Sequence, residues 1–211
     1  MPPNPDNIVL YIGRHGRTSL NASNSFRGNA NPPLDAVGIK EAHELADFFS
    51  SKQISHILCS DKQRAVKTAE IIAQSKGDCP VHKSETLRAL DVGTFSGTPR
   101  NAKSEAALQK YLDNPDTKIP GGESLNEFKA RIGPCFAAAI KICEECGVPP
   151  LIVGHSSVVH EAGSLTRGDH KSVLVQPGGA IALFIKDGKI QAEPIFKPLK
   201  VSPDSKAKTI T

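Results

Sequence analysis

Arginine and histidine side chains gather directly after the first apolar segment of the chain. Residues 8–12 form a short β-favouring run, and residues 13–18 read GRHGRT. A guanidinium presents a fork of donors that suits phosphate oxygens, and an unprotonated imidazole can attack phosphorus. The pattern therefore indicates a phosphate site in which His15 is a covalent nucleophile and Arg14 a phosphate ligand. The competing interpretation is a surface turn that happens to contain these residues.

Two later segments repeat this arrangement of an apolar strand followed by polar side chains. Residues 56–60 predict a strand, and Asp61 is expected to open a helix whose first turn carries Arg64. Residues 151–153 predict another strand, followed by His155 and by serines that can cap the next helix. Taken singly, Arg64 could be a solvated arginine and His155 a structural histidine. Because ligands bind beyond the carboxyl ends of parallel strands, the three segments together favour one anion site.

The elements between these segments alternate between strand and helix patterns. Asp35 is expected to cap a helix over residues 37–51, and further helices are predicted over residues 61–74, 104–112 and 123–146. Loops are predicted over residues 21–33 and 87–97, and a hairpin joins residues 180–185 and 189–195. The fold class predicted is α/β: a three-layer sandwich with a mainly parallel central sheet, helices on both faces and an antiparallel strand pair near the C-terminus.

Length and composition limit the other possibilities. A chain of 211 residues favours a single domain over residues 1–200, with residues 201–211 as a flexible tail. A net charge of +4, two Tyr and no Trp argue against nucleic acid as the partner. No apolar run reaches the roughly 20 residues of a membrane span, and residues 1–7 lack the apolar core of a signal peptide.

Cysteine usage points to a reducing compartment. The chain has five Cys, an odd number without framework-like spacing, which predicts free thiols and a cytoplasmic location. Cys143 and Cys146 form a lone CxxC pair. A second pair of ligands is missing from the sequence pattern, so a zinc site is not predicted there.

Several motifs follow one another in an order typical of a known family. They are RHG at residues 14–16, TxxN at 18–21, PLxxxG at 33–38, SxxxRAxxTA at 60–69, PGGES at 120–124 and GHS at 154–156. With this ordered set the chain resembles the histidine phosphatase superfamily, phosphoglycerate-mutase-like branch, over residues 8 to 196.

The resemblance implies a two-step phosphoryl transfer through phosphohistidine at His15. Arg14, Arg64 and His155 would hold the phosphoryl oxygens and neutralise developing charge. The expected substrate contacts are Asn21, Arg27, Gly28, Glu123 and Ser156. No metal and no other cofactor is implied, and the partner is a small phosphorylated substrate.

One position departs from the family pattern. The family often has LxExxxG before the third helix, with Glu as general acid for the leaving alcohol. Residues 87–93 read LRALDVG here, so Ala89 occupies the Glu position. Asp91 is the nearest replacement, with Glu85 and Glu123 as other candidates. A missing acid can cost about 10²–10⁴-fold in rate when the leaving group is poor.

Three functional hypotheses remain. The first is a phosphatase acting on a phosphomonoester or an activated phosphate, for which a missing acid matters less. The second is a bisphosphoglycerate-dependent phosphoglycerate mutase. It is disfavoured because the segment 97–120 is short and lacks the longer insertion typical of mutases in the family that the chain resembles. The third is a phosphate-ester binding protein with weakened catalysis, motivated by Ala89. His160 is a further candidate that could replace an arginine or simply pack on its helix. The oligomeric state and the identity of the substrate stay open.

Overall fold

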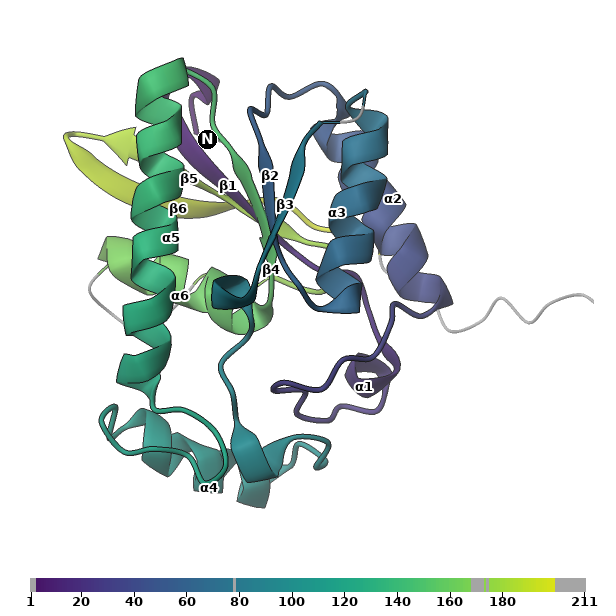
Figure 1. Ribbon diagram of the computed structural model, residues 1–211, viewed down its shortest axis with the longest axis vertical. Helices are drawn as coiled ribbons and strands as arrows, with labels where there is room; N and C mark the ends of the chain where they lie inside the picture. Colours follow the sequence, from purple (N-terminus) through teal and green to yellow (C-terminus); the bar gives the residue numbers. More distant parts are fainter. Residues whose placement is uncertain (1–2, 78, 168–172, 174, 200–211) are drawn as a thin grey trace, which may run out of the picture.

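A six-stranded sheet forms the centre of the protein (Figure 1). The computed structural model describes residues 3–77, 79–167, 173 and 175–199. The strands are β1 (Ile8–Arg14), β2 (Ile57–Ser60), β3 (Val81–Ser84), β4 (Leu151–Gly154), β5 (Ala180–Lys186) and β6 (Lys189–Phe196), in the order β3-β2-β4-β1-β5-β6. β3, β2, β4 and β1 are parallel, while β5 pairs antiparallel with both β1 and β6.

Helices cover both faces of the sheet, as the sequence predicts. They are α1 (Ser19–Ala22), α2 (Ala36–Ser50), α3 (Gln63–Ser75), α4 (Ala102–Leu112), α5 (Leu125–Cys146) and α6 (Ser156–Arg167). α2 and α3 pack on one face, and α5 and α6 pack on the other (Figure 1). α4 lies beyond the sheet edge, below the lower end of α5 in Figure 1. The predicted three-layer α/β sandwich is confirmed.

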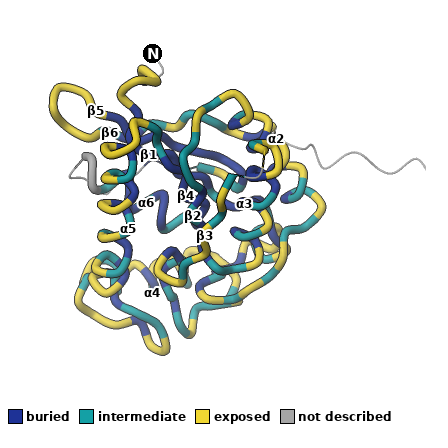
Figure 2. Tube along the Cα trace, turned by 45° about the horizontal axis from the view of Figure 1, so that its top comes forward, coloured by how far each residue is buried: buried dark blue, intermediate teal, exposed yellow. Residues whose placement is uncertain are grey.

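The central strand β1 shows why the sheet is buried on both sides. Leu10 and Ile12 belong to the core cluster that includes α5 and α6, whereas Tyr11 belongs to the cluster that includes α2 and α3. All three residues are buried, and Figure 2 shows the strands at the centre of the molecule mostly in the dark blue of buried residues. Successive side chains of a strand point to opposite faces, so a strand with helices on both sides reads as a continuous apolar run.

Most predicted element boundaries lie within a few residues of the observed ones, with two informative exceptions. β1 does not stop at Gly13 but continues through Arg14, which places that arginine on the strand itself. Asp61 does not cap α3; the N-cap is Lys62, without a side-chain cap. The Asp61 carboxylate instead binds Arg88, whose Nε lies 2.8 Å from Oδ1. Asp35 caps α2 as expected, accepting the backbone N–H of Gly38 at 2.8 Å.

Other local features were missed or fall outside the description. β3 and the short α1 were not predicted. A 3-10 turn, Glu85–Leu87, ends where the predicted 87–97 loop begins, and another, Gly93–Phe95, lies within that loop. The hairpin is confirmed, with Asp187 and Gly188 at φ 51° and 69°. The predicted tail, residues 201–211, lies outside the described residues. Within the described part of the chain, no helix is long and apolar enough to cross a membrane.

Candidate active site

Three neighbouring parallel strands bring the predicted residues together. β2, β4 and β1 are adjacent, so Arg64, His155 and the pair Arg14–His15 emerge at the same edge of the sheet. Arg64 Nε donates a hydrogen bond to His15 Nε2 at 3.1 Å. The rings of His15 and His155 meet edge to face, with centroids 5.2 Å apart. Segments about fifty and ninety residues apart in sequence thus form one cluster, as the three strand ends predict.

The hydrogen bonds of His15 define its tautomer. Nδ1 lies 2.6 Å from the Gly16 carbonyl oxygen, which can only accept, so Nδ1 carries the proton. Nε2 is therefore the unprotonated nitrogen. Burial lowers the pKa of His15 well below its usual value, and His155 and the arginines Arg64 and Arg14 lower it further. The imidazole is thereby held neutral and nucleophilic.

The groups around His15 form a buried cationic cluster. Burial, followed by repulsion from Arg27, lowers the pKa of Arg14 to about 9 and that of Arg64 to about 10. Arg64 is fully buried. Burial and the surrounding arginines also lower the pKa of His155. Concentrated positive charge of this kind is stabilised by a bound oxyanion.

Several polar atoms of this cluster lack partners. Arg14 Nη1 donates to the Val175 carbonyl at 2.8 Å, but Arg14 Nε and both ring nitrogens of His155 are buried without a hydrogen-bond partner in the described structure. Buried polar atoms are normally satisfied, so unpaired ones call for an explanation. A phosphoryl group would supply acceptors for the Arg14 Nε–H and for the N–H of His155.

The loop that carries His15 is fixed by two close contacts. A Cβ atom on Gly16 would lie 2.2 Å from the Gly38 carbonyl oxygen, so the loop can touch the start of α2 only with glycine at this position. The Gly16 N–H donates to the Thr68 hydroxyl at 3.2 Å, and that hydroxyl donates to the Arg64 carbonyl at 2.8 Å. Gly16 thus allows close contact between this loop and α2.

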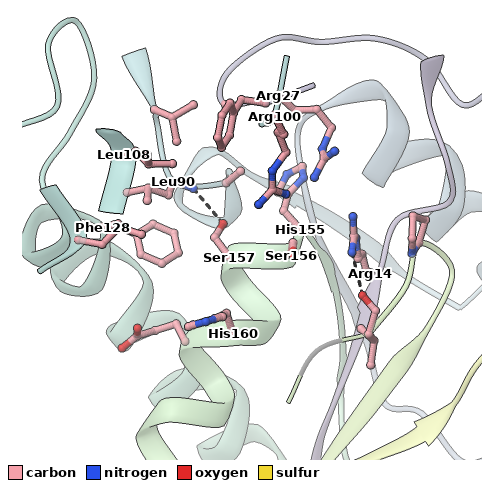
Figure 3. Close-up of a pocket in the computed structure, with 18 of the residues that line it drawn as sticks. Arg14, Arg27, Leu90, Arg100, Leu108, Phe128, His155, Ser156, Ser157 and His160 are labelled. Atoms are coloured by element: carbon pink, nitrogen blue, oxygen red, sulfur yellow. Dashed lines mark hydrogen bonds between the residues drawn. The ribbon is translucent and has the colours of Figure 1, made fainter. Parts of the chain in front are cut away.

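A cavity of about 970 Å³ opens in front of the cluster. Of the predicted site residues, Arg14, Arg27, Gly28, Arg64, His155 and Ser156 line it. His15 lies behind these, only 1% exposed, in contact with Arg64 and His155. Figure 3 shows Arg14, Arg27, Arg100 and His155 on one side of the cavity, and Leu90, Leu108 and Phe128 on the other.

Besides His15, three predicted residues do not line this cavity. Asn21 accepts hydrogen bonds from the Thr18 N–H at 3.1 Å and the Thr18 hydroxyl at 2.9 Å, and so completes the cap of α1. Asp91 and Glu123 line a separate cavity of about 300 Å³. The Asp91 carboxylate accepts from Asn29 Nδ2 at 2.7 Å and from the Gly93 N–H at 3.0 Å.

The expected replacement acids line the smaller cavity and not the main one. Glu123 is bound by Arg131 at 2.6 and 2.9 Å, and also accepts the Asp91 N–H at 2.8 Å. Glu85 is exposed and pairs with Arg88. Ala89, at the family's acid position, does line the main cavity. Asp91, two residues further along the chain, lines the smaller cavity instead.

Sequence reasoning missed several residues that shape the site. Arg100 lines the main cavity and lies over the Phe26 ring, with Cζ 4.9 Å from the ring centroid. The Ser157 hydroxyl accepts the Leu90 N–H at 3.0 Å, which ties α6 to the 87–93 loop (Figure 3). Ser157 was expected to act as a helix cap. No local sequence pattern indicates these contacts, because Phe26 is distant in sequence from Arg100, and Leu90 is distant from Ser157.

Possible metal-ligating side chains do not gather at one place in the described part of the chain. Among the described residues, no group of three or more His, Cys, Asp and Glu side chains is arranged to hold a metal ion. All five cysteines are free; Cys143 is buried and Cys146 exposed. His160 lines the main cavity on α6 (Figure 3).

A buried neutral imidazole among arginines at the carboxyl edge of an α/β sheet defines an enzyme that transfers phosphoryl groups through histidine. Comparison with known families agrees. The model of the histidine phosphatase superfamily (branch 1) matches residues 10–170, and the chain belongs to this superfamily.

Individual relatives span most of the chain. Proteins named probable phosphoglycerate mutase GpmB from Salmonella choleraesuis and Proteus mirabilis are 35% identical over 152 residues, covering 70% of this chain and 69% of theirs. A mycobacterial glucosyl-3-phosphoglycerate phosphatase in complex with VO3 has a TM-score of 0.74 at 21% identity, covering 89% of this chain and 98% of its own. A phosphoglycerate mutase from Bacillus anthracis has a TM-score of 0.75 at 21% identity, covering 90% and 94%.

Proposed function

We propose that the protein is a phosphatase that hydrolyses a small phosphorylated substrate through phosphohistidine at His15. The observation that carries this proposal is the tautomer of His15. Its Nδ1–H is held by the Gly16 carbonyl, while Nε2 faces Arg64 and neighbours His155. A fixed nucleophilic nitrogen beside unsatisfied donors is what phosphoryl transfer needs.

The reaction proceeds in two displacements. His15 Nε2 forms a bond to phosphorus as the ester oxygen departs with its electron pair. Water then attacks phosphorus, the P–N bond breaks, and inorganic phosphate and neutral His15 result. Arg14, Arg64 and His155 stabilise the equatorial oxygens in both steps, since positioning and charge carry most of the catalysis.

The charge is supplied by side chains, so we also propose that turnover needs no metal ion. Arg27, Gly28 and Ser156, which line the cavity with the cluster, are proposed substrate contacts. Five free cysteines support a cytoplasmic location, and residues 1–200 are proposed to form a single domain. Activity that survives extensive treatment with a chelator would support the metal-independent mechanism, and its loss would contradict it.

The test of the nucleophile uses His15→Ala with a small activated phosphate such as acetyl phosphate. The wild-type protein is expected to release phosphate and, when quenched in base, to carry an acid-labile phosphoryl group at residue 15. His15→Ala should lose both properties while keeping its circular dichroism spectrum. Turnover undiminished in the variant would refute the proposal.

Two alternatives have their own support. The relatives named probable phosphoglycerate mutase GpmB favour a phosphoglycerate mutase. Phosphoglycerate interconversion primed by the bisphosphate would establish the bisphosphoglycerate-dependent form. Ala89 favours a binding protein with weakened catalysis. Tight binding of phosphate esters without turnover or labelling would establish that role.

A further inference from the structure

The main cavity combines two surfaces of different character. One end carries the cationic cluster described above. The opposite wall is mainly apolar and comes from the loop 87–93, α4 and the start of α5. Its apolar side chains are Leu90, Val92, Leu108, Leu112, Leu125 and Phe128, with Gln109, Asp113 and Lys129 lining the cavity beside them. Figure 3 shows Leu90, Leu108 and Phe128 facing the side of the cavity on which Arg27, Arg100 and His155 lie. A phosphate bound by the arginines would direct the rest of its molecule along this wall.

The apolar wall is poorly suited to a sugar or glycerate group. Hydroxyls placed against leucine and phenylalanine would lose their hydrogen bonds to water without replacement, which is costly. An apolar group gains by entering such a space. The planar Arg100 guanidinium, already stacked on Phe26 at one edge of the cavity, is also able to stack on a flat ring.

Few carboxylates line the cavity. Among the described lining residues, only Asp113 and Glu161 carry one. Asp113 is the C-cap of α4, on the apolar side, and accepts a hydrogen bond from Gln109 Nε2 at 2.8 Å. Glu161 is six residues beyond His155, which puts it about 9 Å along the helix axis at 1.5 Å per residue, and it accepts the Ser164 hydroxyl at 3.2 Å.

The leaving oxygen must therefore depart without a proton from a neighbouring carboxylic acid. A phenol ionises with a pKa of about 10, whereas the pKa of water, which resembles an aliphatic alcohol, is far higher. The phenoxide is the far better leaving group under these conditions. The chemistry of the site and the shape of the cavity favour the same kind of molecule.

Building on the proposed phosphatase activity, we propose that the substrate class is the aryl phosphates, monoesters of an acidic hydroxyl carried by an apolar aromatic body. The P–O bond to the ring breaks, the phenoxide leaves with the electron pair and takes its proton from water, and phosphohistidine is hydrolysed by a second water. The ring occupies the space between Arg100 and the apolar wall.

The decisive comparison is phenyl phosphate against cyclohexyl phosphate, which are similar in size and apolarity but differ in the acidity of the leaving hydroxyl. We expect kcat/KM to be at least about 10²-fold higher for the phenyl ester, the range attributed to a general acid. Ala89→Glu restores a carboxylate to the cavity and should narrow this gap by accelerating the cyclohexyl ester selectively. Equal wild-type rates for the two esters would overturn the proposal, and an unchanged gap in Ala89→Glu would count against it.

The apolar wall is tested with Leu112→Gln, at a partly buried position where a polar side chain keeps the volume. In Leu112→Gln, kcat/KM for 1-naphthyl phosphate should fall about tenfold more than kcat/KM for acetyl phosphate, because an apolar contact is removed. Leu112→Met should restore kcat/KM for 1-naphthyl phosphate. Ile185→Gln, at a half-exposed position on β5 outside the cavity, is the matched control. Equal effects on the two substrates in Leu112→Gln would overturn the role of the wall.

Acetyl phosphate distinguishes failure of the proposed aryl phosphate preference from failure of the proposed phosphatase activity. If it is hydrolysed through phosphohistidine while phenyl and cyclohexyl phosphate react equally, the aryl preference fails and the phosphatase stands. If it neither reacts nor labels His15, the phosphatase proposal itself fails.

Discussion

Lowering the pH from about 7 to about 5.5 is expected to destabilise the protein through His15 and His155. Both side chains are almost fully buried beside arginines, and both pKa values lie well below the usual one. In the unfolded chain each imidazole binds a proton below a pH of about 6.5. The unfolded state thus takes up more protons than the folded state, so stability falls as the pH drops below that value.

The size of the loss follows from linkage. For one histidine that stays neutral in the folded state, the free energy of unfolding falls by about 1.2 kcal/mol over this pH change. Two such residues give about 2.5 kcal/mol. The loss begins near the unfolded pKa and continues until the pH reaches the lower folded values.

Urea unfolding followed by far-UV circular dichroism measures this directly, because the chain has no Trp and only two Tyr for fluorescence. The control is His15→Asn combined with His155→Asn, which keeps polar side chains of similar size. Carboxylates whose pKa is lowered in the fold, such as Asp61 beside Arg88, contribute equally to both proteins. Between about pH 7 and 5.5, the free energy of unfolding of the wild type should therefore fall by about 2.5 kcal/mol more than that of the double variant. An equal loss in the two proteins would refute the assignment of neutral buried histidines.

Three substitutions test the structure around the nucleophile. Gly16→Ala should cost about 3 kcal/mol in urea unfolding, because its Cβ would meet the Gly38 carbonyl oxygen at 2.2 Å; a stability equal to wild type would show that the contact can relax. Arg64→Met should lower kcat/KM by about 10³-fold without reducing unfolding stability, since a buried charge is removed; full activity would exclude Arg64 from the reaction. Ser157→Ala should cost about 1–2 kcal/mol by leaving the Leu90 N–H unpaired, and an unchanged urea midpoint would contradict this.

The cationic cluster could be predicted from sequence because it depends on strand ends. Apolar runs at residues 8–12, 56–60 and 151–153 identify parallel strands, and a parallel sheet aligns their carboxyl ends whatever the intervening loops do. The residue that follows each run is thereby placed without knowledge of side-chain contacts. Arg14, Arg64 and His155 were located in this way, and the hydrogen bond between Arg64 and His15 then follows from their proximity.

Features that depend on contacts between distant segments could not be predicted. β3 is an edge strand whose residues, Val81–Ser84, are mostly polar and partly or fully exposed, so it lacks an apolar period. Asp61 has the residue type of a helix cap, but its carboxylate is taken by Arg88, 27 residues further on. The capping propensity of Asp61 is overridden by its ion pair with Arg88, which no local sequence pattern predicts.

The path of the loop around Ala89, the position of the family's general acid, could not be predicted from sequence either, and it affects the chemistry of the site. Along the loop 87–93, Ala89 lines the main cavity, the Leu90 side chain is buried with its N–H bound to Ser157, and Asp91 lines the smaller cavity. Arg131 fixes this path by donating to the Ala89 carbonyl at 2.8 Å while binding Glu123. A carboxylate two positions along the chain therefore cannot swing into the site without breaking these contacts. The Asp91 carboxylate thus lines the smaller cavity only, and this arrangement supports the proposed preference for substrates whose leaving group departs unaided.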